Sequence, residues 1–370
     1  MKLLILMSDT GGGHRSPAEA IAAALERLEP RSDVELVDFF ATCAPFPLNQ
    51  AGAIYGPWVN YATPLWAAGF HLTDGRRRAA VLNWMISMAT RRPVEAILQT
   101  FQPDVLACVH PLATRLAADV RRRAGRVLPL ATIVTDLSTA HAAWFTPDVD
   151  LLVAPGEKVR KRAVKAGIPQ ENVVITGQPV HPRFIDIAVD KCTARRSLGL
   201  DPNRYTVLLI GGGEGMGSVA AMSTAIDGAG LPVQQIVICG RNESLRRRLD
   251  KQSWRVPTRV LGFVRNMPNL MAAADVVATK AGTSTICEAL VVGRPILLTG
   301  YIPGQEPGNV DFVVEAGAGQ LTDSPPALIA ALQNLINSKS RIQERMADNA
   351  RRLAKPEAAW DVAELLLDLG

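Results

Sequence analysis

Short apolar runs alternate with stretches of helical periodicity along most of this 370-residue chain. Apolar runs bounded by Gly, Pro or polar residues predict buried strands, and apolar residues repeating at three- and four-residue spacing predict helices. The alternation is typical of α/β proteins, in which helices cover both faces of a parallel sheet. The predicted strands are residues 2–7, 34–39, 104–109, 130–135, 151–154 and 173–176, followed by 207–210, 235–239, 258–261, 276–278 and 296–299.

The predicted helices of the first half lie between these strands, at residues 17–28, 76–89, 94–101, 113–124 and 157–166. Ser16 followed by Pro17 predicts the start of the first helix, because Ser caps a helix N-terminus and Pro is tolerated in the first turn. An amphipathic helix from about residue 356 to 367 is predicted near the end of the sequence.

Two prolines and a glycine in residues 177–182 interrupt the alternation and predict a linker. The chain is therefore expected to form two doubly wound, Rossmann-like domains, residues 1–180 and 185–355, with segment 356–370 packing back on the first. Ligands of such sheets bind at the carboxyl ends of the strands. We expect the functional site in a cleft across which the two domains face each other.

Residues 44–84 break the alternation and hold seven of the chain's 19 aromatic residues. One interpretation is a long insertion packed on the first domain. The other is a membrane-interfacial element, because Trp and Tyr beside Arg side chains suit a lipid headgroup region. The side chains that favour the second interpretation are Trp58, Trp66 and Trp84 with Arg76, Arg77 and Arg78.

The charge of the chain is mildly positive and unevenly distributed. The formal net charge is +5, yet residues 69–126 alone hold ten basic and four acidic side chains. With no recognisable nucleic-acid module, this field suits an anionic surface better than nucleic acid. Five scattered cysteines support neither a disulfide framework nor a zinc site and fit a reducing cytosol. No run of 18 apolar residues occurs, so any membrane contact is expected to be peripheral.

A glycine-rich turn follows the first predicted strand, at residues 8–16. Its three consecutive glycines, Gly12 and Gly13 among them, allow a tight turn and close backbone approach. The turn is neither a Walker loop nor a strict G-x-G-x-x-G, and it could be purely structural. His14 directly after the glycines is hard to explain by packing, so we predict a role in catalysis. Asp136 and His141, near the end of strand 130–135, are expected to face the same cleft.

Two further turns follow strands of the second half. In residues 211–217, Gly212 and Gly213 allow backbone amides to approach a diphosphate. In residues 278–289, the strand ends at Lys280, and Thr283 or Ser284 is predicted to cap a helix whose first turn carries hydroxyls suited to phosphate oxygens.

Two polar sites accompany these turns. Glu288, one turn into the helix, could accept both ribose hydroxyls or lie on a solvated face. Gln305 and Glu306, on a Pro-Gly turn after the last predicted strand, offer hydrogen bonds to a polyol.

These segments resemble the monogalactosyldiacylglycerol synthases of plastids and the related bacterial diacylglycerol glucosyltransferases. The matching stretches run nearly end to end and in order: SDTGGGHRSPAEAI at 8–21, VTDLSTAHAAWF at 134–145, TGQPVHPRF at 176–184, VLGFV at 260–264, TKAGTSTICEAL at 279–290 and YIPGQEPGNV at 301–310. The resemblance implies the GT-B fold, which this family shares with the peptidoglycan N-acetylglucosaminyltransferase.

The resemblance also assigns roles, which agree with the reading of the motifs. His14 is implied as a catalytic base or acceptor-site residue, and we add Asp136 as its orienter or rival. From the motifs and the resemblance together, the predicted donor-binding residues are Gly212, Gly213, Gly262, Phe263, Val264, Lys280, Gly282, Thr283, Ser284, Thr285, Glu288, Gln305, Glu306 and Asn309. The predicted acceptor- and membrane-binding residues are Gly12, Gly13, Trp58, Trp66, Trp84, Arg76, Arg77, Arg78, His141 and Trp144.

We therefore expect an inverting glycosyltransferase that moves a hexose, galactose rather than glucose, from a UDP-hexose to 1,2-diacylglycerol. The expected partners are these substrates and an anionic membrane surface, with no nucleic acid. The expected location is cytoplasmic, peripheral on the inner face of the cell membrane. No cofactor or metal is expected, since Asp148-Val149-Asp150, which has the D-x-D spacing, precedes a strand as an ordinary turn.

Three alternatives remain open at this point. The chain could be a UDP-sugar epimerase or a glycosyltransferase for another lipid-linked acceptor. A membrane-bound nucleotide sensor without turnover is the non-enzyme alternative, against which His14 argues.

Overall fold

The computed structural model describes residues 1–370 except 11, 126, 214, 216–217 and 339–340. The contacts between residues divide the chain into two compact units. Unit 1 comprises Met1–Pro182, Pro303–Gly308 and Lys355–Gly370, and unit 2 comprises Arg183–Ile302 and Asn309–Ala354. The turn Pro303–Gly308 thus packs with unit 1, although the sequence analysis placed it within 185–355.

Unit 1 is built on a parallel sheet with the strand order β2-β1-β3-β4-β5-β6. The central β1 pairs with β2 on one side and with β3 on the other. The connection from β1 to β2 runs toward one side of the sheet, and the connection from β2 to β3 runs back toward the other side. A topological switch point therefore lies between β1 and β3. The strands are β1 (Lys2–Met7), β2 (Asp33–Asp38), β3 (Val105–Cys108), β4 (Leu130–Ile133), β5 (Leu151–Ala154) and β6 (Val173–Ile175).

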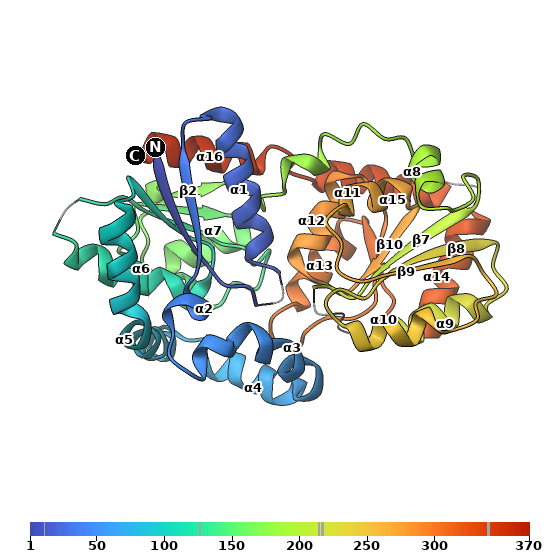
Figure 1. The fold of residues 1–370 in the computed structure, drawn as a ribbon, viewed down its shortest axis with the longest axis horizontal. Helices are drawn as coiled ribbons and strands as arrows, with labels where there is room; N and C mark the ends of the chain where they lie inside the picture. Colours follow the sequence, from blue (N-terminus) through green and yellow to red (C-terminus); the bar gives the residue numbers. More distant parts are fainter. Residues whose placement is uncertain (11, 126, 214, 216–217, 339–340) are drawn as a thin grey trace. The chain divides into compact units, whose positions relative to one another are not determined.

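Helices cover both faces of this sheet (Figure 1). They are α1 (Arg15–Leu28), α2 (Phe39–Cys43), α3 (Ala51–Tyr61), α4 (Thr63–Thr73), α5 (Arg76–Phe101), α6 (Pro111–Arg123), α7 (Glu157–Lys165) and α16 (Ala358–Leu369). Short 3₁₀ turns lie at Leu48–Gln50, Ala142–Trp144, Gln170–Asn172 and Pro182–Phe184.

The core of unit 1 is split by the sheet into two apolar layers. Along β1, Leu4 and Leu6 face the layer that contains α5 and α6, whereas Leu3 and Ile5 face the layer that contains α1 and α16. All four side chains are fully buried, as expected for a parallel sheet covered on both faces. The helix α16 packs against α1 in the second layer, where the Arg27 guanidinium lies 5.6 Å from the centre of the Trp360 ring.

Two predicted helix boundaries of unit 1 are wrong. The first helix begins at Arg15 with His14 as its N-cap residue, not at Pro17 with a Ser16 cap. The two helices predicted on either side of Pro93 form one helix, α5. A proline removes one backbone donor, but the buried stripe that includes Ile86, Thr90 and Val94 continues through it and packs on α6.

The segment 44–84, which breaks the sequence alternation, contains α3, α4 and the start of α5. The helices α2, α3 and α4 were not predicted from the sequence. The reason is that α3 and α4 are apolar around much of their circumference, so the polar face that marks a helix is missing.

Unit 2 repeats the doubly wound plan with the strand order β12-β11-β10-β7-β8-β9, all parallel. Its switch point lies between β7 and β10. The strands are β7 (Tyr205–Ile210), β8 (Val233–Ile238), β9 (Thr258–Leu261), β10 (Val276–Thr279), β11 (Ile296–Leu298) and β12 (Gly319–Leu321), of which β12 was not predicted. The helices are α8 (Lys191–Ser197), α9 (Val219–Gly228), α10 (Glu243–Asp250), α11 (Met267–Ala273), α12 (Thr283–Val291), α13 (Pro307–Glu315), α14 (Pro325–Asn337) and α15 (Arg341–Leu353).

Each unit therefore has the Rossmann-like α/β architecture that the sequence predicted. Both switch points coincide with the turns that the motifs marked: 8–16 after β1, and 211–217 and 278–289 after β7 and β10.

Candidate active site

The switch point of unit 1 holds two neighbouring histidines. His14, at the N-terminus of α1, has its Nδ1 2.8 Å from Thr135 Oγ1 beyond the end of β4. The ring of His110, which follows β3, lies 4.5 Å from the His14 ring in an edge-on arrangement. His110 Nδ1 accepts a hydrogen bond from the Leu112 backbone N–H and caps α6. The two rings are thus held by the first residues of two different helices.

Burial decides the charge of His14. Desolvation lowers the pKa of His14 to about 4, against an opposing hydrogen bond with the Val109 backbone. Desolvation, and after it the proximity of His14, also holds the pKa of His110 well below its usual value. Both imidazoles are therefore neutral at pH 7, and a neutral imidazole can accept a proton.

The second proton-accepting group is Asp136, in the loop after β4. Its Oδ2 accepts a hydrogen bond from Trp144 Nε1 at 2.7 Å. Desolvation raises the pKa of Asp136 to about 6; the nearby charge of Glu306 acts in the same direction, and the Trp144 hydrogen bond opposes it. This carboxyl therefore titrates close to the pH range in which a general base works best.

The turn Pro303–Gly308 brings its predicted sugar-binding pair to this loop. A Cβ at Gly308 would clash with Thr139 Oγ1 and would lie 2.7 Å from Ser138 Cβ, so the turn packs this closely on residues 138 and 139 because residue 308 is glycine. Glu306 is buried, and Gln305 Oε1 lies 3.5 Å from the Tyr55 hydroxyl of α3. The site in unit 1 thus combines His14, Asp136, Gln305 and Glu306.

The switch point of unit 2 surrounds the side chain of Lys280. A Cβ at Gly212 would lie 3.3 Å from Lys280 Cε, and a Cβ at Gly282 would lie 3.3 Å from Lys280 Nζ. The ammonium group therefore lies beside both glycine turns, next to the N-terminus of α12. A cation and a helix N-terminus at one place form a site for an anionic group such as a diphosphate.

Two hydroxyls near this N-terminus can donate hydrogen bonds to such a ligand. Ser284 Oγ and Thr279 Oγ1 are buried and, among the described residues, have no hydrogen-bond partner. The N-cap of α12 is Gly282, not Thr283 or Ser284 as predicted, so the hydroxyls of the first turn are not used as caps. Glu288 lies further along α12 and is partly buried. Asn309 is buried, and its Nδ2 donates to the Ala281 carbonyl at 2.9 Å. This hydrogen bond fixes the turn that precedes α12.

Phe263 follows β9, at the same edge of the sheet, with its neighbours Gly262 and Val264. Its ring is 58% exposed and lies 5.2 Å from the Arg241 guanidinium. The backbone N–H of Arg241 donates to the Gly213 carbonyl at 2.8 Å. An exposed aromatic ring backed by a guanidinium offers a flat surface on which a base can stack. Part of the predicted turn, Glu214, Met216 and Gly217, lies outside the described residues, as does Gly11.

The predicted acceptor and membrane residues divide into a surface group and a buried group. Trp58 and Trp84 are 50% and 60% exposed, and Arg76, Arg77 and Arg78 are exposed at the start of α5. Trp66 is only partly buried, yet its Nε1 is buried and has no partner among the described residues. Gly12, at φ +81°, makes the turn before His14 that a side chain would strain, and Gly13 continues it.

Trp144 and His141 are buried, so of the predicted acceptor- and membrane-binding residues these two do not belong to the surface group. Trp144 is fully buried and donates to Asp136. His141 Nε2 lies 3.2 Å from Thr73 Oγ1, and its ring packs 4.9 Å from Phe70. Both side chains therefore fix the loop that carries Asp136.

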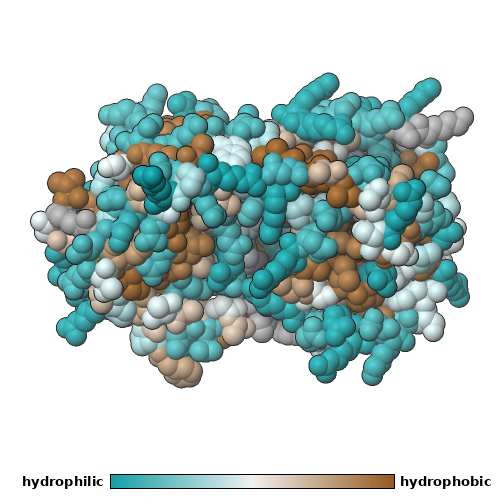
Figure 2. All heavy atoms as spheres, turned by 45° about the horizontal axis from the view of Figure 1, so that its top comes forward, coloured by the Kyte–Doolittle hydropathy of each residue, from teal (hydrophilic) through white to brown (hydrophobic). Residues whose placement is uncertain are grey.

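Exposed apolar residues lie on each of the three helices α3, α4 and α5. Hydrophilic residues project over much of the face drawn in Figure 2, with smaller hydrophobic areas between them. On α3–α5, by contrast, large apolar side chains are exposed on three successive helices that contact one another. This apolar surface consists of Ile54, Trp58, Leu65, Leu72, Val81, Trp84, Met85 and Met88. Within the described residues, no helix is both long and apolar enough to cross a membrane.

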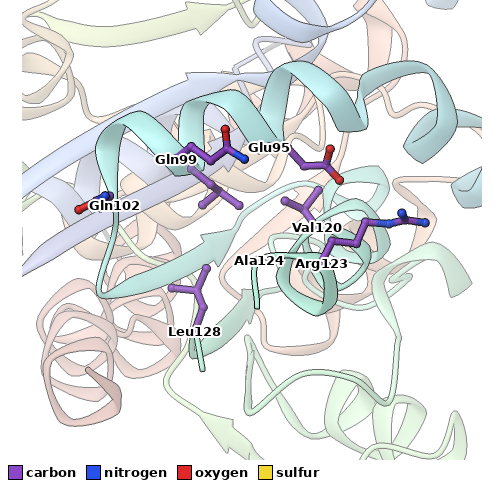
Figure 3. Close-up of a pocket in the computed structure, with 8 residues that line it drawn as sticks. Glu95, Gln99, Gln102, Val120, Arg123, Ala124 and Leu128 are labelled. Atoms are coloured by element: carbon purple, nitrogen blue, oxygen red, sulfur yellow. The ribbon is translucent and has the colours of Figure 1, made fainter. Parts of the chain in front are cut away.

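A hollow of about 670 Å³ lies elsewhere in unit 1, between the C-terminal parts of α5 and α6 (Figure 3). Glu95, Gln99, Gln102 and Arg123 line it over an apolar floor that includes Leu128. None of the predicted site residues is among its lining residues. Asp148 and Asp150 pair with arginines of the neighbouring α6: Asp150 with Arg121, and Asp148 with Arg115 and Arg122.

Three groups of the candidate site in unit 1 were not predicted, His110, Thr135 and Tyr55, and neither was Arg241 in unit 2. His110 carried a signal, because it follows a strand and precedes Pro111 at a helix start, much as His14 follows a strand and precedes a helix. Nothing in the local sequence links Tyr55 to residue 305, 250 positions away.

Solved structures share this architecture over nearly the whole chain. The MurG of Acinetobacter baumannii matches with a TM-score of 0.60 at 14% identity, covering 99% of each chain. The UDP-GlcNAc 2-epimerase of Neisseria meningitidis, bound to UDP-GlcNAc, matches with a TM-score of 0.65 at 15% identity over 100% of each chain. At these identities the likeness shows the fold, and it shows that two kinds of enzyme share it.

Family comparisons separate the two kinds. The sequence model described as "Monogalactosyldiacylglycerol (MGDG) synthase" matches residues 14–180. The model described as "Glycosyltransferase family 28 C-terminal domain" matches residues 206–362. Together with the fold, they define a UDP-sugar-dependent glycosyltransferase of the GT-B fold.

The relatives identify the family. Monogalactosyldiacylglycerol synthase 1 of Arabidopsis thaliana is 39% identical over 378 residues, covering 100% of this chain and 71% of the relative. The synthase of Spinacia oleracea is 38% identical over 378 residues, covering 100% of this chain and 72% of the relative. The chain belongs to the monogalactosyldiacylglycerol synthase family.

The comparison overturns the expected location. Both relatives are named as chloroplastic. The expectation of a cytoplasmic protein on the inner face of the cell membrane is therefore wrong.

Proposed function

We propose that this enzyme transfers galactose from UDP-galactose to the free hydroxyl of 1,2-diacylglycerol, with inversion at the anomeric carbon. The observation that carries the proposal is the grouping of two proton-accepting side chains, His14 and Asp136, with the sugar-binding pair Gln305 and Glu306 in unit 1. The named activity of the full-length relatives supports the choice of galactose and diacylglycerol.

The reaction is a displacement at the anomeric carbon of the donor sugar. The oxygen of the acceptor hydroxyl forms a bond to this carbon as the bond from the carbon to the UDP oxygen breaks. His14, neutral at working pH, accepts the acceptor proton, and Asp136 is the alternative base. Removal of this proton by a positioned base contributes typically 10²- to 10⁴-fold to the rate.

The departing UDP carries the negative charge that develops in the transition state. We assign the stabilisation of this charge to Lys280, which lies beside Gly282, and to the N-terminus of α12; one well-aimed donor is worth about 10²- to 10³-fold in rate. We propose that this cation removes the need for a divalent metal ion. Turnover should then be unchanged in EDTA, whereas loss of turnover that Mg²⁺ restores would contradict this proposal.

The acceptor reaches the site from a bilayer, so the enzyme must bind a membrane surface. We propose that the apolar surface on α3–α5 and the three arginines at the start of α5 make this contact. Arg76, Arg77 and Arg78 lie in the first turn of α5, where the helix dipole disfavours positive charge. An anionic surface compensates for that unfavourable placement.

The test of the reaction class is UDP release. The enzyme is incubated with UDP-galactose and vesicles that contain or lack diacylglycerol. A glycosyltransferase releases UDP in step with glycolipid and only with diacylglycerol present. Interconversion of UDP-sugars without diacylglycerol would identify an epimerase instead.

A further inference from the structure

The helix pair α3–α4 has two functional faces. One face carries Trp58, Leu65 and Leu72 of the apolar surface, and all three side chains are at least half exposed. The other face contacts the turn Pro303–Gly308. The same two helices therefore carry the surface proposed for lipid and the wall behind the proposed sugar-binding turn.

The contact with the turn is close. Gly304 has φ +85°, and a Cβ there would lie 3.4 Å from His71 Nε2, 3.5 Å from Phe70 Cδ1 and 3.6 Å from Ala67 Cα, all on α4. The neighbouring residue, Gln305, receives a hydrogen bond from Tyr55 of α3, with 3.5 Å between the Tyr55 hydroxyl and Gln305 Oε1. The turn thus lies against side chains and backbone of α4, and the hydrogen bond from Tyr55 orients the Gln305 carboxamide.

A series of edge-on aromatic contacts holds Tyr55 in this position. The Tyr55 ring lies 5.2 Å from the Trp66 ring, and the Trp66 ring lies 6.2 Å from the exposed Trp58 ring. Such aromatic pairs stabilise the packing by more than the apolar area that they bury. Three rings from two helices therefore lead from the apolar surface to Gln305.

The electrostatic surroundings keep Tyr55 a donor. Burial, and after it the charges of Glu306 and Asp136, raises the pKa of the Tyr55 hydroxyl above its usual value. The hydroxyl stays protonated at every working pH, so the Gln305 oxygen is engaged as acceptor. The Tyr55 hydrogen bond therefore fixes which end of the Gln305 carboxamide is the oxygen and which is the NH₂ group, and the NH₂ group can only donate.

We propose that Tyr55 is a positioning residue for donor-sugar recognition, which fixes the Gln305 carboxamide so that it reads one arrangement of sugar hydroxyls. This inference rests on the proposed function, in which Gln305 and Glu306 hold the hexose. It goes beyond that function because it places a specificity determinant in the helix pair that carries the lipid-binding surface.

The test compares Tyr55→Phe with the parent enzyme on UDP-galactose and UDP-glucose. The variant keeps the ring and its packing against Trp66 and removes only the hydroxyl. A neutral hydrogen bond is worth about 2- to 10-fold in an equilibrium constant, so we expect KM for UDP-galactose to rise about that much. The preference for galactose over glucose should fall, while inhibition by UDP alone and binding to vesicles stay unchanged.

Two controls separate positioning from a general structural effect. Tyr205→Phe removes the hydroxyl of a tyrosine at the start of β7 in unit 2, and it should leave KM and the sugar preference as in the parent. The double variant Tyr55→Phe/Gln305→Ala should behave like Gln305→Ala alone, because Tyr55 acts through Gln305.

The outcomes are distinct. An active parent whose KM and sugar preference are the same in Tyr55→Phe would overturn this inference and leave the proposed function standing. A Tyr55→Phe effect that persists in full without Gln305 would also overturn it. A parent that transfers neither hexose to diacylglycerol would overturn the proposed function and this inference together.

Discussion

Two side chains of unit 1 can accept the acceptor proton, and their pKa values differ enough to tell them apart. The pKa of His14 is lowered to about 4, and the pKa of Asp136 is raised to about 6. A general base works when deprotonated, so activity is lost as the pH falls through its pKa. With His14 as base, kcat/KM should stay level from pH 8 to about 5 and decline near 4.

The measurement is the pH profile of kcat/KM for the parent and for Asp136→Asn. With His14 as base, the decline near pH 4 persists in the variant. A parent decline centred near pH 6, absent from Asp136→Asn at its residual rate, would assign the base to Asp136.

Removal of the His14 imidazole gives the complementary test. His14→Ala should lower kcat by about 10²-fold or more, the size of a general-base contribution. Binding of UDP, measured by calorimetry, should be unchanged because its proposed site is in unit 2. Near-normal turnover in this variant would remove His14 from the mechanism.

Glu288 and Gln305 are predicted to read different parts of the donor. Glu288→Ala should weaken UDP itself by about 1–3 kcal/mol, the cost of a lost hydrogen bond to a charged group. Gln305→Ala should spare UDP and weaken only the whole UDP-sugar. Both variants are compared by calorimetry with Glu344→Ala, an exposed residue of α15 that should change neither affinity. Equal losses for both ligands in both variants would show that one residue is misplaced.

At the residue scale, the functional groups that lie in motifs were predicted from the sequence, and those that act through long-range contacts were not. His14 and Gly282 follow strand ends, where parallel sheets bind ligands. Tyr55 became visible only when the fold brought it to Gln305, far away in the sequence. The burial of Trp144 and His141 could not be predicted for the same reason, since it depends on what packs on them.

At the element scale, the start of α5 combines charge with exposed apolar groups in a way that packing does not require. Replacing Arg76, Arg77 and Arg78 by Ser should reduce binding to anionic vesicles by roughly 10- to 100-fold at low salt, since each arginine near such a surface contributes ~1 kcal/mol. Added salt should diminish the difference, because the attraction is screened. Co-sedimentation with vesicles measures it.

Unit 1 offers a matched control, a second run of three arginines at Arg121, Arg122 and Arg123 in the last turn of α6. Their replacement by Ser should leave vesicle binding near that of the parent. UDP binding should be intact in both triple variants. Equal sedimentation of the Arg76–Arg78 variant and the parent would show that the surface over α3–α5 does not carry the membrane contact.

All strands of the described residues except β12 were predicted to within a few residues, because a strand buried on both faces is a run of apolar residues, as residues 3–7 of β1 are. Helix boundaries were less predictable where tertiary packing overrides a local signal. Pro93 marks a break in the sequence, yet α5 continues through it on a buried stripe. In α12 the residue at the N-cap position is Gly282, so the hydroxyls of Thr283 and Ser284 do not cap the helix.

At the scale of the whole molecule, the order of strands and helices predicted two doubly wound sheets, and the structure has them. The grouping of Pro303–Gly308 with unit 1 could not be predicted. It depends on Gly304 and Gly308 meeting α4 and residues 138–139, and no local pattern encodes such contacts.

The most direct test of the account is identification of the lipid product. The enzyme is incubated with 1,2-diacylglycerol in anionic vesicles and with UDP-galactose or UDP-glucose, and the extracted lipids are analysed by mass spectrometry and NMR. The account predicts monogalactosyldiacylglycerol with a β-linked sugar, formed from UDP-galactose faster than any product forms from UDP-glucose. A diacylglycerol fraction that carries no hexose after complete mixing with both donors would contradict it.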